Sequence, residues 1–161
     1  MKIKKDVPCI FIRLVDYNKN NFIEEHIKAF KKKGYVWLLK MGKPTKDSFM
    51  KEVLKSGGGL ITKATARNGN QFYYCEVESC TPDDSLYYPD YYKEIFENGF
   101  YTESDITKIG SWFKIKSINP LSDKQVDNFK TISTNRSLLE CGKKFNQVSQ
   151  MHVKSDKDIE L

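Results

Sequence analysis

The sequence lacks any apolar run long enough to cross a membrane. A transmembrane helix needs about 20 consecutive apolar residues, and no stretch of this 161-residue chain approaches that length. The N-terminus is basic, but the apolar segment and small-residue cleavage site of a signal peptide do not follow it. We therefore expect a cytoplasmic protein that makes no membrane contact.

Cysteine and histidine are scarce as well. The chain has four cysteines and two histidines. With no secretion signal, free thiols are expected rather than disulfides. Four residues separate Cys75 from Cys80, and no second pair matches them, so the spacing does not resemble a zinc site. We expect no metal and no cofactor.

The common catalytic motifs are missing too. The sequence contains no Walker loop, no GxGxxG and no GxSxG. The run 57–59 is all glycine, but it lacks the spacing of a phosphate-binding loop and is interpreted as a helix stop. Glu76 and Glu78 share one face of a strand, where solvated carboxylates are expected. His26 falls on the apolar side of a helix and is interpreted as a residue at the edge of the core. Enzymatic activity is therefore not favoured.

Positive charge is in excess. The 27 Lys and Arg residues against 21 Asp and Glu residues give a formal charge of +6. Hydrophobic residues make up 39% and charged residues 30% of the chain, which is typical of a globular protein. A basic excess is compatible with nucleic-acid binding, although a run such as Lys31 to Lys33 equally fits a solvated face.

The first half of the chain alternates strand and helix signals. We expect a strand over 7–15, and then a helix that begins after a polar turn and ends at Gly34. The run 35–41 is mostly apolar and predicts a buried central strand. Thr45 begins a short helix. Two strands, 59–66 and 71–79, are joined across Asn-Gly, a strong hairpin signal.

In that hairpin, Tyr73, Cys75 and Val77 are predicted to face the core, and the opposite face begins apolar and ends acidic. The tyrosine-rich segment 87–92 leads into a short helix from about Pro89.

The second half predicts a strand over 111–118 that ends at Asn119-Pro120. Ser122 is expected to cap a short helix. A last strand follows at 147–153, and the charged tail 154–161 is expected to be frayed. No internal repeat or linker is visible, so the fold class predicted is α+β, one domain with a small, curved, mixed sheet flanked by short helices.

Aromatic residues alternate with cations at several predicted strands. Flat rings beside Lys or Arg can stack a base and neutralise its phosphates. This pattern supplies the candidate nucleic-acid-binding and base-binding residues: Trp37, Lys40, Lys63, Arg67, Trp112, Lys114 and Arg136.

The order of these segments resembles the PUA-like superfamily, closest to its EVE and ASCH branches. The motifs that carry the resemblance are the Tyr-Val-Trp-Leu-Leu-Lys strand, Trp-Phe-Lys-Ile-Lys followed by Asn-Pro-Leu, and the Arg-Ser segment before the last strand. It covers roughly 34–153 and leaves an N-terminal strand and helix, about 1–33, as an addition.

The resemblance implies a small β-barrel-like sheet that binds DNA or RNA and holds a modified or flipped base in an aromatic pocket. It places Trp37, Lys40, Trp112 and Arg136 near that pocket, with Lys63 and Arg67 as phosphate contacts.

Two alternatives stay open. A small ASCH-like hydrolase would use Lys63, Thr65 and Glu76. A regulatory protein, such as a defence-system component or an inhibitor, would grip a protein partner through the tyrosine-rich segment 87–92.

Overall fold

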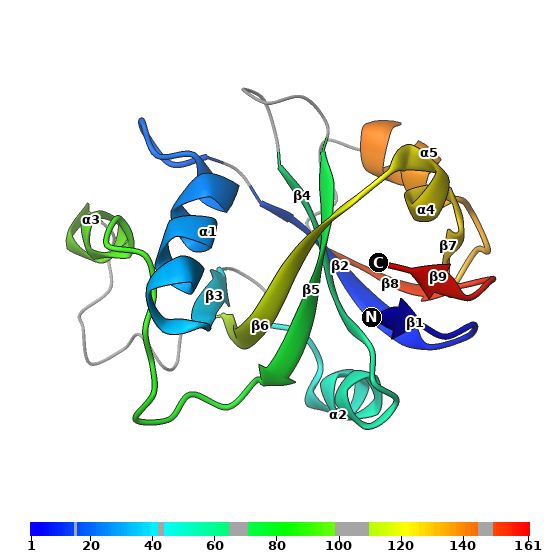
Figure 1. Ribbon diagram of the computed structural model, residues 1–161, viewed down its shortest axis with the longest axis horizontal. Helices are drawn as coiled ribbons and strands as arrows, with labels where there is room; N and C mark the ends of the chain where they lie inside the picture. The colour runs from blue at the N-terminus through cyan, green and yellow to red at the C-terminus, as the bar shows by residue number, and fades with distance from the viewer. Residues whose placement is uncertain (15, 42–43, 65–70, 99–109, 145–149) are drawn as a thin grey trace.

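The computed structural model describes residues 1–14, 16–41, 44–64, 71–98, 110–144 and 150–161. It is an α+β fold in which short helices surround a mixed sheet (Figure 1). The elements, in chain order, are β1 (Lys2–Ile3), β2 (Pro8–Leu14), α1 (Phe22–Lys33), β3 (Val36–Lys40), α2 (Asp47–Lys55), β4 (Gly59–Ala64), β5 (Phe72–Ser79), α3 (Tyr92–Asn98), β6 (Ser111–Leu121), α4 (Asp123–Asp127), β7 (Phe129–Thr131), α5 (Leu138–Lys144), β8 (Gln150–Ser155) and β9 (Ile159–Glu160).

Seven strands form the main sheet in the order β3-β6-β5-β4-β2-β8-β7. Strands β2 and β4 are parallel, and the other neighbours are antiparallel. The expectation of an α+β fold with a mixed sheet is confirmed. Among the described strands the sheet is mostly open and does not close into a barrel. Strand β2 lies inside the sheet, so the first segment of the chain is part of its framework.

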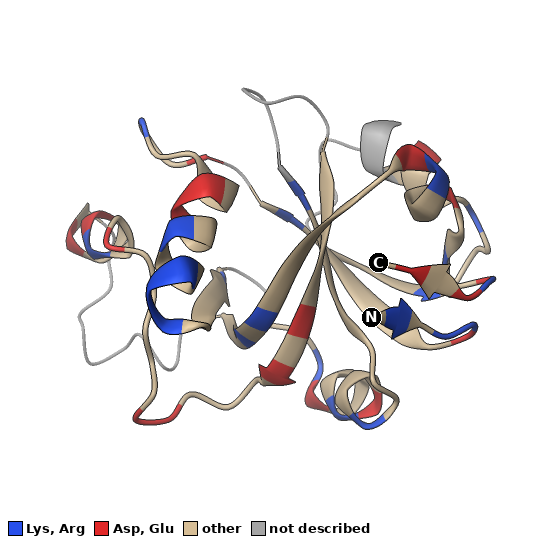
Figure 2. Ribbon diagram, in the orientation of Figure 1, with Lys and Arg blue, Asp and Glu red and all other residues tan. Residues whose placement is uncertain are grey.

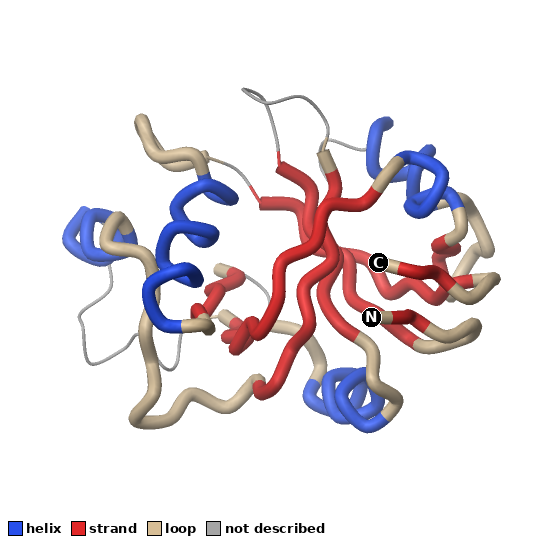
Figure 3. The backbone as a smooth tube through the Cα atoms, viewed as in Figure 1, coloured by secondary structure: helices blue, strands red, loops and turns tan. Residues whose placement is uncertain are grey.

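The sheet has a hydrophobic cluster on each face, with helices on both sides (Figure 3). The first cluster joins the sheet to α1, α2 and α3, and the second joins it to α4, α5 and the small β1–β9 pair. The prediction of a single core face for β5 is therefore wrong. Cys75 and Val77 are buried in the first cluster, while Phe72 and Tyr74 on the opposite face are buried in the second.

Helix α1 begins and ends where the sequence predicts. The side chain of Asn21 accepts a hydrogen bond from the Glu24 amide at 3.2 Å, an N-cap that satisfies one of the free N–H groups of the first turn. Gly34 ends the helix with φ of 75°, a left-handed conformation that costs glycine little. The buried side of the helix, including Phe22 and His26, packs onto the first cluster.

Strand β3 was predicted to be central, but it is an edge strand. It pairs with β6 and is the first strand in the sheet order. All five of its residues are buried, because α1 packs against it and the tyrosine-rich segment covers its open edge. The Trp37 amide donates to the Tyr87 carbonyl at 2.7 Å. Such cover protects an edge from pairing with other chains.

Two predicted boundaries are wrong in the second half. Strand β6 continues through Pro120 to Leu121. Proline has no backbone N–H to donate. Strand β3 pairs only with the part of β6 before residue 116, so Pro120 removes no hydrogen bond between β6 and β3. The tail is not frayed, because Ile159 pairs with Ile3 in the β1–β9 sheet and is buried.

Within the described residues, no helix is long and apolar enough to cross a membrane.

Candidate functional site

A cavity of about 420 Å³ lies where the C-terminal ends of β2 and β3 approach the start of α1 and helix α3. We call it the aromatic cavity. Among its lining residues are five aromatic side chains: Tyr17, Phe22, Tyr91, Tyr92 and Phe96. The Tyr91 and Tyr92 rings meet edge to face, with centroids 5.0 Å apart. These side chains give the cavity a largely apolar, aromatic lining.

A buried chain of hydrogen bonds holds that lining in place. His26 Nδ1 lies 2.8 Å from the Phe22 carbonyl, which can only accept, so Nδ1 carries the proton. His26 Nε2 is then the acceptor for the Tyr92 hydroxyl at 2.7 Å. The same hydroxyl accepts from the Leu39 amide at 3.1 Å. Burial lowers the pKa of His26 to about 4, which keeps the ring neutral.

The polar groups of the cavity include a donor and an acceptor that no group of the described residues satisfies. Arg13 Nη1 and Asp16 Oδ2 are both shielded from solvent and have no hydrogen-bond partner. The other carboxylate oxygen of Asp16 accepts from the Phe22 amide at 2.9 Å, which fixes the side chain. Buried groups of this kind are rare in native proteins, and a bound molecule is one explanation for them.

Lys40 adds a second cation to the lining. Only 3% of the residue is exposed, and burial lowers the pKa of its ammonium group. The described lining therefore holds two basic residues and one acidic residue among aromatic rings. It can bind a flat, polar molecule that both donates and accepts hydrogen bonds.

Six of the seven residues proposed from the sequence are described, and of these six Lys40 alone lines this cavity. Trp37 and Trp112 are 0% and 1% exposed and belong to the first hydrophobic cluster. The indole nitrogen of Trp37 donates to the Ser85 carbonyl at 3.2 Å. Neither ring presents a face on which a base could stack.

The remaining candidates lie apart from one another. Lys63 is buried, with its Nζ 5.9 Å from the centre of the Phe72 ring. Lys114 pairs with Glu78 at 2.9 Å. Arg136 is exposed in the turn that follows β7. Arg67 lies outside the described residues. The structure thus does not assemble the predicted set into one site.

The residues suspected of hydrolysis are also separated. Lys63 is opposite Phe72 in the β4–β5 pair, whereas Glu76 is opposite Gly59. These positions are four residues apart along the strand, a distance of about 13 Å at the usual rise per residue. Thr65 lies outside the described residues. In the described part of the chain, no group of three or more His, Cys, Asp or Glu residues could hold a metal ion.

The tyrosine-rich segment packs mainly inward. Tyr91 and Tyr92 are 5% and 2% exposed. Tyr88 stacks on Tyr92 with ring centroids 5.5 Å apart and also contacts Trp112. A partner protein would therefore meet only part of this segment, around Tyr87 and Tyr88.

Sequence reasoning missed Arg13, Asp16 and Tyr17 as site residues. A signal for them was present, because Arg13 interrupts an otherwise apolar strand and a carboxylate follows three residues later. What the sequence could not show is that the ends of β2 and β3 meet at one cavity.

Comparison with protein-family models, curated proteins and solved structures finds no match to this chain.

Proposed function

We propose that this protein binds nucleic acid and holds one extruded base in the aromatic cavity. One observation carries the proposal: two buried groups without a hydrogen-bond partner, the Arg13 donor and the Asp16 acceptor, line the same aromatic cavity. Nucleobases combine a π face with hydrogen-bond donors and acceptors along one edge. A base would satisfy both groups at once.

The energies expected for stacking and hydrogen bonding favour a nucleobase as the ligand. Stacking on aromatic side chains contributes about 1–3 kcal/mol per base, and extrusion from a duplex costs a few kcal/mol. A hydrogen bond to a charged group adds about 1.5–3 kcal/mol. The cavity volume of about 420 Å³ falls within the range of small-molecule sites.

Net charge supports the proposal in a general way. The formal charge of +6 attracts a phosphate backbone. Figure 2 shows Lys and Arg spread over several elements rather than gathered on one face. Charge would therefore supply non-specific affinity, and selectivity would come from the cavity. In this proposal the curved mixed sheet is a PUA-like scaffold, acting in the cytoplasm.

The sharpest test replaces Asp16 with Asn. Asn retains the oxygen that caps the Phe22 amide and replaces the free carboxylate oxygen with an NH₂ group. Removing a negative charge strengthens binding that depends on electrostatics alone. If Asp16 contacts a base, the same substitution should instead weaken binding, with a loss of about tenfold or more in affinity for the preferred oligonucleotide.

Fluorescence anisotropy with single- and double-stranded DNA and RNA, with and without modified bases, measures this affinity across a salt series. Asp84→Asn is the matched control, because Asp84 is exposed and outside the cavity. Arg13→Gln, compared with Lys5→Gln, tests the donor in the same way. Tighter or unchanged binding by Asp16→Asn would refute the base-binding proposal, and equal salt-sensitive affinity for every oligonucleotide would leave only a basic surface.

A further inference from the structure

A second cavity, of about 480 Å³, lies beside the turn that follows β7. We call it the β7 cavity. It shares no lining residue with the aromatic cavity. Its lining comes from the turn, from α5 and from the start of β8: Thr131, Ile132, Ser133, Thr134, Arg136, Cys141, Gln150, Met151 and His152.

The turn is held by its own hydrogen bonds. The Thr131 hydroxyl lies 2.6 Å from the Thr134 hydroxyl and accepts from the Arg136 amide at 3.0 Å. The Thr131 amide in turn donates to the Arg136 carbonyl at 2.9 Å. Asn135 has φ of 53°, a conformation that asparagine tolerates better than most residues. The backbone that carries Ser133, Thr134 and Arg136 is therefore fixed before any ligand arrives.

The β8 side of the cavity is also ordered. Thr45 donates to Gln150 Oε1 at 3.0 Å, which turns the Gln150 amide nitrogen toward His152 Nε2 at 3.3 Å. His152 Nε2 then accepts, and its proton lies on Nδ1. The ring stacks on Phe49, with centroids 3.7 Å apart and planes 9° from parallel. Burial and the nearby charge of Lys46 lower the pKa of His152.

The charge of this lining has one sign. None of its described residues is acidic, and Arg136 supplies a permanent positive charge. Ser133, Thr134, Gln150 and His152 all carry groups that can donate hydrogen bonds. Arginine with neighbouring donors is the usual arrangement for binding phosphate oxygens.

We propose that the β7 cavity binds a phosphoryl group, held by Arg136 and the Ser133 hydroxyl. The apolar side chains of Ile132 and Met151 leave room for the organic part of a phosphate ester. The phosphoryl group belongs either to a free mononucleotide or to a nucleic-acid backbone. This site stands without the base-binding proposal, because it uses different residues.

The test uses the ring signals of His152 in NMR spectra of the whole protein. Only two histidines are present, and the other is buried between α1 and α3. Inorganic phosphate is titrated at neutral pH with ionic strength held constant by chloride. The expected result is a saturable shift with a Kd on the order of 1–10 mM. Titration with a mononucleotide and with a dinucleotide then distinguishes the two sources.

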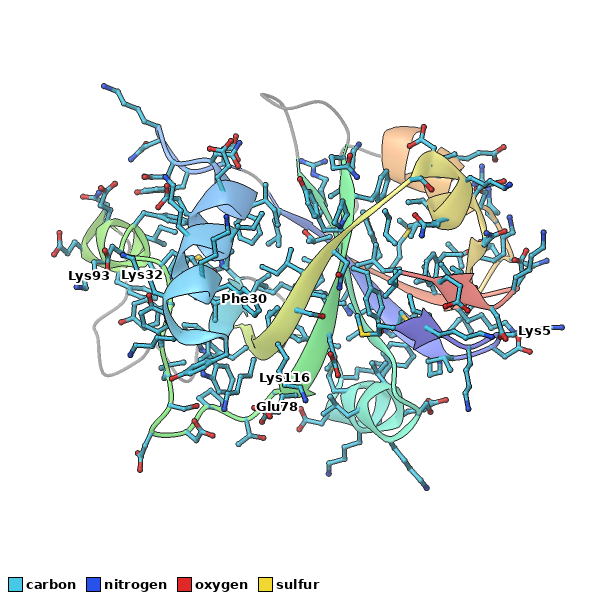
Figure 4. All side chains as sticks on the ribbon, viewed as in Figure 1. Lys5, Phe30, Lys32, Glu78, Lys93 and Lys116 are labelled. Carbon is cyan, nitrogen blue, oxygen red and sulfur yellow. The ribbon has the colours of Figure 1, made fainter. Side chains whose placement is uncertain are left out.

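Two variants locate the binding. Arg136→Gln is expected to weaken phosphate binding at least about tenfold, and Ser133→Ala several-fold. Lys32→Gln is the matched control, because Lys32 is exposed on α1, on the opposite side of the view from α5 and β7 (Figure 4). A shift that does not saturate, or an equal loss in Arg136→Gln and Lys32→Gln, would overturn the proposal.

Discussion

The hydroxyl of Tyr92 lies 2.7 Å from Nε2 of His26, and this contact joins helix α3 to helix α1 across the wall of the aromatic cavity. Both residues are almost completely buried. The hydroxyl is used twice, since it donates to the imidazole and accepts from the Leu39 amide. Two helices and the edge strand β3 therefore depend on one phenolic group.

Replacing Tyr92 with Phe should destabilise the protein by about 2–4 kcal/mol, because the change leaves the imidazole nitrogen and the Leu39 amide buried without a partner. Urea unfolding followed by circular dichroism measures the effect. Tyr35→Phe is the control, with an expected change within about 0.5 kcal/mol, since Tyr35 is only partly buried. Equal stability of the two variants would show that the hydroxyl is not a structural link.

His26 makes stability depend on pH in a direction that follows from its pKa. Burial lowers the pKa of His26 in the folded protein to about 4, below its usual value of 6.5. The unfolded chain therefore binds the proton first, and stability falls as the pH drops from about 6.5 to about 4. The loss attributable to His26 is on the order of 3 kcal/mol.

Urea unfolding at several pH values within this window tests the effect, with His26→Gln as the comparison. The difference in unfolding free energy between wild type and variant should shrink toward pH 4, because only the wild type has this buried imidazole to protonate. A difference that stays constant from neutral pH to pH 4 would contradict the assignment. The lowered pKa of His152 acts in the same direction but cancels in the comparison.

Local structure was predictable because its signals lie close together in the sequence. The start of α1 after a polar turn, the Gly34 stop and the Ser122 cap of α4 all appear as expected. The order of strands was not predictable in this way. The apolar run of β3 is equally typical of a central strand and of an edge strand covered by other parts of the chain.

The site was harder to predict for the same reason. An aromatic ring beside a lysine looks alike in the sequence whether the ring is buried or exposed. Trp37 and Trp112 are the largest of the fully buried side chains. Their size made them attractive as stacking platforms, but it also makes them effective core residues. Arg13 and Asp16 gained meaning only when the fold brought them to the aromatic cavity.

A comparison of Trp112 with Asp16 therefore gives a prediction that separates a core role from a binding role. Trp112→Ala should lower the free energy of unfolding by about 3–5 kcal/mol, as expected for removal of a buried ring. Asp16→Asn should leave it nearly unchanged, because the cap on Phe22 is retained. Denaturant unfolding of both variants provides the measurement. Wild-type stability in Trp112→Ala would mean that this ring is not part of the core.

The C-terminal segment gives the last prediction. Strand β9 pairs with β1, and the Leu161 amide donates to the Met1 carbonyl at 2.9 Å, so the two ends of the described chain hold each other. Ile159 is 3% exposed and packs into the second cluster with Ile3. Ile159→Ala should therefore cost about 2–5 kcal/mol of stability. Glu160→Gln should cost less than about 1 kcal/mol, because its contact with Lys2 is a solvent-exposed ion pair.

Hydrogen exchange tests the same pairing without relying on total stability. The Leu161 amide should exchange slowly in the wild type and in Glu160→Gln, and quickly in Ile159→Ala, because loss of the buried side chain releases the strand that holds it. Rapid exchange of this amide in the wild type would mean that the segment is frayed, as its charge alone suggests. Protection that is present in the wild type and lost in Ile159→Ala would show that this buried side chain helps to hold a charged terminus against the second cluster.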